Sequence, residues 1–185
     1  MRIIAGDAKG RTLKAPVGNE TRPTSDKVRE ALFSILMREV PDSRVLDLFG
    51  GTGALGLEAM SRGAESCVIC DVSAKAIMSI QDNVRAVMKD RPGVTVIKAD
   101  YRTALNSLMG KTFDLVFLDP PYRMEEAYAE TAGFLAEHGM IAEDGIIVAE
   151  RSAQTVLHWP AGWKCRDTRT YRDTCIELVV PEVDQ

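Results

Sequence analysis

The residues best placed to do chemistry directly follow the apolar run VFL at 116–118; they are Asp119, Pro120, Pro121 and Tyr122. Proline lacks a backbone donor and has a fixed φ, so the run predicts a strand that ends with a carboxylate at its tip. The Asp119 carboxylate and the Pro120 carbonyl could accept both N–H bonds of an exocyclic amine on a nucleobase, and Tyr122 could stack on the base. The amine lone pair, otherwise delocalised into the ring, would then point toward a methyl donor. The four residues therefore predict a catalytic site for amine methylation that works by positioning and electrostatics.

A second candidate site lies in the sequence LDLFGGTGALG at 46–56. Gly51, Gly53 and Gly56 form the pattern G-x-G-x-x-G before an expected helix, and Asp71 follows 20 residues after Gly51. Glycines in this place allow a tight turn and the close approach of a ligand, and an acid at the tip of the second strand suits a ribose diol. The pattern predicts nucleotide-type binding; the alternative is a turn that only packs the helix against the sheet.

The acids at this edge indicate which nucleotide-type ligand to expect. Asp47, Asp71 and Asp100 each end an expected strand, and three carboxylates would repel the pyrophosphate of NAD. S-adenosylmethionine (SAM) carries a cationic amine, a sulfonium and no phosphate, so it is the predicted cofactor. Asp100 is placed to accept from the adenine amino group. The predicted cofactor contacts are Asp47, Phe49, Gly50, Gly51, Thr52, Gly53, Asp71, Val72, Asp100 and Tyr101.

These side chains need a scaffold that brings several strand ends to one edge. Strand and helix patterns alternate from residue 44 onward, which predicts a mostly parallel sheet with helices on both faces. Strands are expected at 44–49, 66–71, 94–100, 113–119 and 145–150, with helices at 53–62, 73–89, 102–109 and 125–138. Residues 163–180 read as two further strands around a turn near Arg172 and Asp173, which adds an antiparallel strand. The expected fold is a Rossmann-like α/β domain with seven strands.

The N-terminal residues 1–40 are expected to form a hairpin, from 1–5 and 11–15, and a helix capped by Ser25 that reaches about Val40. Residues 1–38 hold eight Lys and Arg against four Asp and Glu, although the whole chain has a net charge of −4. A basic segment on an acidic body suggests a polyanion contact, and a solvated charged face is the alternative. The predicted RNA contacts are Lys9, Arg11, Arg22, Thr24 and Arg29, although Arg22 could instead pair with Asp26.

Composition narrows the class of protein. Hydrophobic residues make up 45% and charged residues 27%, and no apolar run is long enough to cross a bilayer. The N-terminus lacks the apolar region of a secretory signal, and four cysteines without a disulfide pattern fit a reducing cytoplasm. Cys67 and Cys70 fall in one expected strand and point to opposite faces, and only two histidines are present, so no metal site is predicted.

Taken together, four stretches of this sequence resemble the bacterial RsmD family of 16S rRNA guanine-N2 methyltransferases. They are MRIIAGDAKGRTLKAP, TRPTSDKVREALFSIL, LDLFGGTGALGLEAMSRGA and LDPPY. The resemblance implies a class I SAM-dependent methyltransferase with the LDPPY residues as its catalytic motif. It also implies 16S rRNA as the partner, either free or within a partly assembled small subunit, and we expect a monomer. The family tends to carry glycine in the last hairpin turn, where this chain has Arg172.

Two other functions share parts of this pattern. A DNA adenine-N6 methyltransferase uses the same D-P-P-Y chemistry, but the chain has no separate target-recognition domain. A non-catalytic RNA-binding or ribosome assembly factor could keep the scaffold, but it would not need an intact Asp119 and glycine turn.

Overall fold

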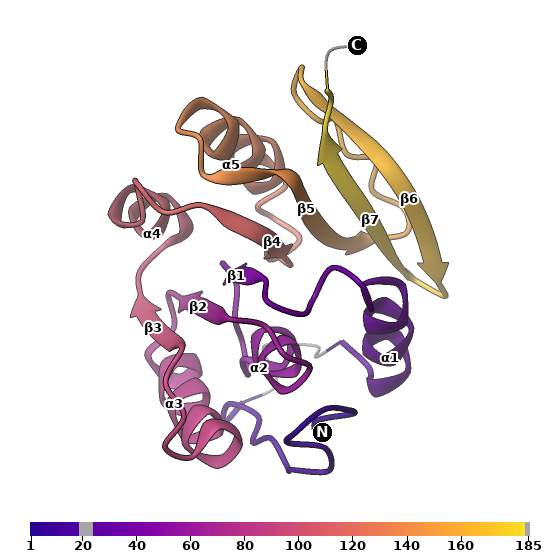
Figure 1. The fold of residues 1–185 in the computed structure, drawn as a ribbon. Helices are drawn as coiled ribbons and strands as arrows, with labels where there is room; N and C mark the ends of the chain where they lie inside the picture. Colours follow the sequence, from indigo (N-terminus) through magenta and orange to yellow (C-terminus); the bar gives the residue numbers. More distant parts are fainter. Residues whose placement is uncertain (19–23, 184–185) are drawn as a thin grey trace.

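A seven-stranded sheet in the order β3-β2-β1-β4-β5-β7-β6 forms the middle layer of the computed structural model, which describes residues 1–18 and 24–183 (Figure 1). Strands β1 to β5 run parallel, and β7 lies antiparallel between β5 and β6. The bounds are β1 Arg44–Asp47, β2 Ser66–Asp71, β3 Val94–Lys98, β4 Phe113–Leu118, β5 Ile141–Ser152, β6 Trp163–Tyr171 and β7 Thr174–Pro181. The predicted Rossmann-like sheet, including its antiparallel closing strand, is confirmed.

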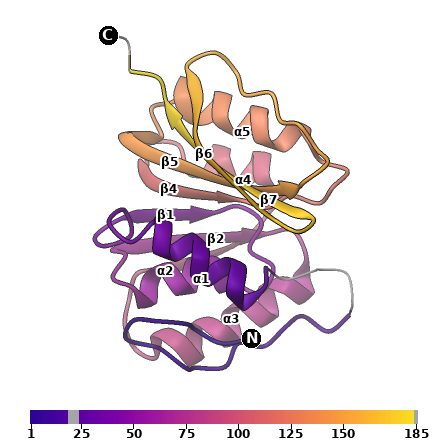
Figure 2. The ribbon, with the colours of Figure 1, turned by 90° about the vertical axis from the view of Figure 1, so that its right-hand side faces the viewer.

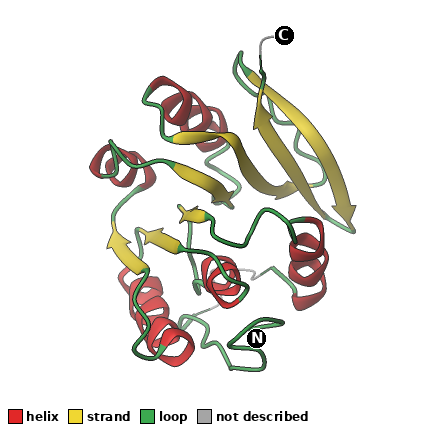
Figure 3. Cartoon of the chain, in the orientation of Figure 1, coloured by secondary structure: helices red, strands yellow, loops and turns green. Residues whose placement is uncertain are grey.

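Helices cover both faces of the sheet, as expected (Figures 2 and 3). Helices α1 Asp26–Ile35, α2 Ala54–Ser61 and α3 Ala74–Met88 lie on one face, and α4 Tyr101–Ser107 and α5 Glu126–Glu137 lie on the other. Successive residues of a strand face opposite layers, so Val45 packs with the first group of helices and Leu46 with the second. Likewise Cys67 and Cys70 of β2 are buried in opposite layers as free thiols.

Side-chain caps set the start of two helices. Ser25 Oγ accepts from the N–H of Val28 at the start of α1, and Ser73 Oγ accepts from the N–H of Ala76 at the start of α3. The expected extension of α1 to Val40 is wrong. The chain continues as turns after Ile35, and Asp42, at φ +60°, leads it into β1.

The N-terminal segment packs against the core instead of extending from it. The expected hairpin is present as a single bridge between Arg2 and Thr12, without extended strands. Ile3, Ala8 and Leu13 are nevertheless buried together with residues of α1, α2 and β1. Residues 1–15 therefore form part of one hydrophobic core with the sheet. Among the described residues, no helix is long and apolar enough to span a membrane.

Candidate active site

The glycine turn between β1 and α2 forms the base of the candidate site. The N–H of Gly50 donates to the Cys70 carbonyl at 2.7 Å, and a Cβ on Gly50 would lie 2.5 Å from Cγ2 of Ile69. Gly51 and Gly53 have φ of +58° and +80°, which favour glycine. A Cβ at Gly51 would meet nothing within 4 Å, so this side of the turn is open to a ligand.

Asp71, at the end of β2, is attached to this turn. Its carboxylate accepts from the N–H of Gly51 at 2.9 Å and from the N–H of Ser73 at 2.8 Å. The structure thus brings the glycine turn and the acid of the second strand together, as the sequence predicted. Val72, the next residue, leaves 68% of its surface exposed, which offers an apolar contact for a flat heterocycle. Thr52 is 7% exposed and uses its hydroxyl to accept from the N–H of Ala54, so it stabilises the turn from within.

Asp47, the last residue of β1, is 2% exposed and has no ion-pair partner within the described residues. Burial raises the pKa of its carboxyl to about 7, the N–H of Gly56 opposes that shift, and the Asp71 carboxylate adds to it. A buried carboxylate without a cation is costly, and a cationic ligand would remove much of that cost. The cationic amine of SAM has the charge that this position lacks, so the residues present fit the predicted cofactor.

The predicted contacts that follow β3 are placed differently from expectation. Asp100 caps α4: its carboxylate accepts from the N–H groups of Arg102 and Thr103, both at 3.1 Å, and from the Thr103 hydroxyl at 2.7 Å. These hydrogen bonds, led by that of the Thr103 hydroxyl, lower the pKa of Asp100. Asp100 remains exposed, so its contact with adenine stays a prediction.

Tyr101 does not present a surface to a ligand. It is 2% exposed, its hydroxyl donates to Glu130 at 2.6 Å, and its ring centre lies 5.6 Å from that of Phe49. The prediction of a cofactor contact by Tyr101 is therefore wrong for its side chain, because the first turn of α4 directs it into the core. Tyr101 instead supports Phe49, which is half-buried next to the glycine turn.

The D-P-P-Y residues begin where β4 ends. Asp119 is half-buried, Pro120 is buried and Tyr122 is 74% exposed. The N–H of Met124 donates to the Pro121 carbonyl at 2.8 Å and closes a turn around Tyr122. Because β1 pairs with β4, with Asp47 opposite Phe117, Asp119 lies at the same edge as the glycine turn. Burial and the carboxylates of Glu150 and Asp47 raise the pKa of Asp119.

Glu150 is a residue of this site that the sequence analysis did not single out. Leu118 pairs with Ala149, which places Glu150 of β5 beside Asp119. Thr24 donates its hydroxyl to Glu150 Oε2 at 2.6 Å, and the Tyr128 hydroxyl donates to the Glu150 carbonyl. A signal existed, because Glu150 ends an expected strand just as Asp47 and Asp119 do. The predicted RNA contact by Thr24 is not supported, since its hydroxyl is used within the site.

The residues predicted to contact RNA differ in their burial and in their partners within the protein. Arg29 is fully buried, donates to the Arg2 carbonyl and to Asp26, and lies 3.9 Å from Glu58, so its assignment to RNA is wrong. Its pKa is lowered by that burial. Arg11 donates to the carbonyls of Ala86 and Val87 at the end of α3, which commits its guanidinium to the fold. Lys9 is exposed and stays a prediction, and Arg22 lies outside the described residues.

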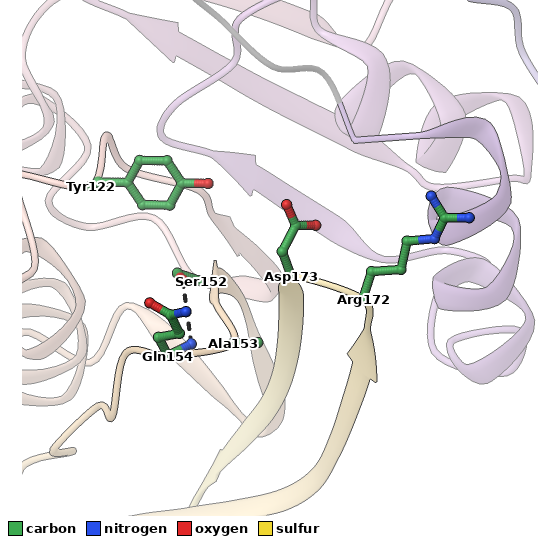
Figure 4. Close-up of a pocket in the computed structure, with 6 residues that line it drawn as sticks. All are labelled: Tyr122, Ser152, Ala153, Gln154, Arg172 and Asp173. Carbon is green, nitrogen blue, oxygen red and sulfur yellow. Dashed lines mark hydrogen bonds between the residues drawn. The ribbon is translucent and has the colours of Figure 1, made fainter.

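A pocket of ≈ 630 Å³ opens next to the D-P-P-Y turn (Figure 4). Its lining residues are Tyr122, Ser152, Ala153, Gln154, Arg172 and Asp173. Three segments far apart in the sequence therefore meet here: the turn after β4, the end of β5 and the β6–β7 turn. Figure 4 shows Tyr122 extending from one wall and Asp173 from the β6–β7 turn. No pattern in the sequence predicted that these residues line one pocket.

Comparison with known proteins places the chain in a family. The family model described as "Conserved hypothetical protein 95" matches residues 1–180. The ribosomal RNA small subunit methyltransferase D of Escherichia coli (strain K12) is 33% identical over 164 residues, which cover 88% of this chain and 81% of that protein. The chain belongs to the RsmD family of methyltransferases.

Two further proteins are similar to this chain over most of its length. The protein YlbH of Bacillus subtilis (strain 168) is 40% identical over 159 residues, 85% of each chain. The solved structure of the E. coli protein yhhF superposes with a TM-score of 0.86 at 30% identity and covers 98% of both chains. The family match over residues 1–180 includes the packed N-terminal segment and all but the last residue of the β6–β7 hairpin. In this RsmD-family chain the methyl donor is SAM.

Proposed function

We propose that this chain transfers a methyl group from SAM to the exocyclic N2 amine of a guanine in small-subunit rRNA. The observation that carries the proposal is the position of Asp119, half-buried at the edge that also holds the glycine turn and Asp47, with Tyr122 exposed beside it. The E. coli relative is named a small-subunit rRNA methyltransferase, which supports rRNA as the substrate class.

The donor part of the reaction needs little from the protein except placement. When bound, SAM supplies a methyl group that its sulfonium already activates. Asp47 would hold the cationic amine, Asp71 would accept from the ribose hydroxyls, and Val72 would cover one side of the adenine. A positive charge beside Asp47 also favours the ionised form of Asp119, because Asp47 and Glu150 both oppose that ionisation in the ligand-free protein.

The acceptor part depends on the residues after β4. The Asp119 carboxylate and the Pro120 carbonyl accept the two N–H bonds of the guanine amine, and the exposed ring of Tyr122 stacks on the base, which must first leave its helix or loop. As the amine nitrogen forms its bond to the methyl carbon, the bond between that carbon and the SAM sulfur would break, and the electron pair would stay on the sulfur, which leaves as a neutral thioether. The nitrogen becomes positively charged and must lose a proton. An ionised Asp119 with a raised pKa is a suitable acceptor for that proton.

The experiment that tests the proposal offers SAM with a radiolabelled methyl group to the protein together with separate RNA and DNA substrates. Purified 16S rRNA, small ribosomal subunits, tRNA and duplex DNA are each supplied, and any labelled base is identified by nuclease digestion and chromatography. Label on guanine N2 of 16S rRNA supports the proposal. Label on adenine N6 of DNA would instead identify a DNA methyltransferase, and rRNA binding without any transfer would identify an assembly factor.

We also propose that the protein acts in the cytoplasm as a monomer. The choice between free rRNA and a partly assembled subunit follows from the same assay. If the site at Asp119 is reached by an unpaired strand, the better substrate is the form that leaves the target guanine unpaired.

A further inference from the structure

The β6–β7 turn carries an arginine in a conformation that arginine seldom adopts. Arg172 has φ +57°, in the left-handed region that glycine and asparagine tolerate better. A strained backbone that persists beside a functional site is an observation that calls for a functional explanation. The turn itself needs no arginine, since β6 and β7 already pair from Tyr171–Thr174 back to Trp163–Pro181, with one register shift between Cys165 and Asp167.

The charge of Arg172 is also used differently from that of its neighbours. Arg166 pairs with Glu39 at 3.2 Å, and Arg169 pairs with Asp167 at 3.0 Å. Arg151, below the turn, is held by Glu177 at 2.6 Å. Within residues 1–18 and 24–183, Arg172 has neither a hydrogen bond nor an ion pair. It is thus a cation available to a ligand at the rim of the Tyr122 pocket.

The pocket beside Arg172 is firmly built. The N–H of Ala153 donates to the Asp173 carbonyl at 2.8 Å and fastens the end of β5 to the β6–β7 turn. The N–H of Gln154 donates to the Ser152 hydroxyl at 3.3 Å, which leaves the Gln154 amide to line the pocket. Figure 4 shows the Arg172 side chain extending outward, away from Tyr122, at the rim. A base could enter the pocket while its phosphate stays at the rim.

We infer that this pocket is a subsite for the RNA strand next to the target guanine. Its Gln154 and Ser152 side chains contact a flanking nucleotide, and the Arg172 guanidinium binds a backbone phosphate. The planar guanidinium suits a phosphate because it donates two parallel hydrogen bonds. A volume of ≈ 630 Å³ lies within the range of small-ligand pockets. Phosphate contacts of this kind fix the register of the strand, so Arg172 is a positioning residue that places the target base at Asp119.

This inference rests on the proposed function, and the test is designed to separate the two. Binding of purified 16S rRNA is measured over a series of salt concentrations for the wild type, Arg172→Gly, Arg172→Lys and Arg169→Gln. The last variant removes a charge from the same hairpin where the arginine is already paired. SAM binding and melting temperature are recorded for each variant.

We expect Arg172→Gly to weaken RNA binding without lowering the melting temperature. RNA affinity falls about tenfold at low salt, and the slope of log affinity against log salt decreases by about one. The melting temperature does not fall, because glycine relieves the left-handed strain. Arg172→Lys keeps the wild-type slope with a smaller loss of affinity, and Arg169→Gln resembles the wild type.

Other outcomes would overturn the inference. Wild-type RNA affinity and salt slope in Arg172→Gly would show that Arg172 contacts no phosphate. An equal loss of RNA affinity in Arg169→Gln would show that the effect comes from the overall positive charge of the hairpin and not from a specific contact of Arg172. If Arg172→Gly does not fold, Arg172→Asn removes the charge with a residue that tolerates the same backbone. A wild type that neither binds nor methylates 16S rRNA would overturn the proposed function and this subsite with it.

Discussion

Buried carboxylates occur in two regions of this molecule, and their surroundings differ. Glu58 of α2 is fully buried and accepts from the N–H groups of Ile4 and Ala5 at 2.9 and 3.1 Å, and from Arg62 Nε at 2.9 Å. Asp47 of β1 is equally buried, yet no cation of the described residues lies at ion-pair distance, and its neighbours at the same edge are also acids.

This difference distinguishes a carboxylate that stabilises the fold from the carboxylates that we assign to ligand binding. Glu58 is satisfied within the folded chain and attaches the N-terminal segment to the core. Asp47 and Asp119 are held where their ionised forms are unfavourable, and a cationic ligand would remove much of that cost. We therefore expect clustered, uncompensated carboxylates to mark the proposed ligand-binding edge more specifically than burial or charge alone.

The largest effect is expected from Asp119→Asn. The amide keeps the shape but replaces an acceptor oxygen with an NH₂ group, so turnover should fall by about 10³-fold while SAM affinity stays within a few-fold. Single-turnover methyl transfer and calorimetry of SAM binding measure the two quantities. Asp114→Asn is the matched control on the same strand, because Asp114 is bonded to Arg44 at the opposite end of β4. Full turnover in Asp119→Asn would refute the assigned role.

Glu58→Gln should affect stability and leave chemistry intact. Ile4 and Ala5 donate to different carboxylate oxygens of Glu58, and glutamine keeps only one acceptor oxygen, so one of these hydrogen bonds is lost. The negative charge that faces Arg62 is lost as well. We expect the free energy of unfolding to decrease by about 3 kcal/mol, measured by urea denaturation. The exposed Glu65→Gln should change it by less than about 0.5 kcal/mol. A Glu58→Gln protein with normal stability but no SAM binding would contradict the structural role assigned to Glu58.

The raised pKa of Asp47 predicts a pH-dependent affinity for SAM. In the ligand-free protein the carboxyl holds a proton below pH about 7, and that proton must leave before the carboxylate can pair with a cationic amine. Affinity should therefore fall as pH decreases below 7, by up to about tenfold per unit. Calorimetry at pH 6 in two buffers of different ionisation enthalpy should detect proton release. Asp47→Asn should bind weakly and without this dependence, and a constant wild-type affinity from pH 6 to 7 would contradict the prediction.

The smallest effects distinguish two cations of the basic N-terminal segment. Arg11→Gln removes donors from the end of α3 and should reduce stability by about 0.5–1 kcal/mol without changing the salt dependence of RNA binding. Lys9→Gln should leave stability unchanged and lower the salt slope by about one. If the Lys9→Gln slope equals that of the wild type, this part of the segment is a solvated face.

The sequence alone determined the features that depend on local pattern. Alternating strand and helix periods predicted the parallel sheet, because each element buries one face by its own repeat. The positive-φ glycines at 51 and 53 and the prolines at 120 and 121 imposed a turn and a strand end whatever packed around them. Since parallel strands bring their carboxyl ends to one edge, the sequence predicted that Asp47, Asp71 and Asp119 lie together there.

The tertiary structure decided the features that depend on which distant residues meet. Arg29 looked like a free cation, but Glu58, 29 positions along the chain, and the Arg2 carbonyl lie beside it in the core. Thr24 and Glu150 are 126 positions apart and are joined by one hydrogen bond next to Asp119. The pocket at Tyr122 likewise needs the β6–β7 turn to reach the end of β5. Such contacts follow from how whole elements pack, and no local period or motif encodes them.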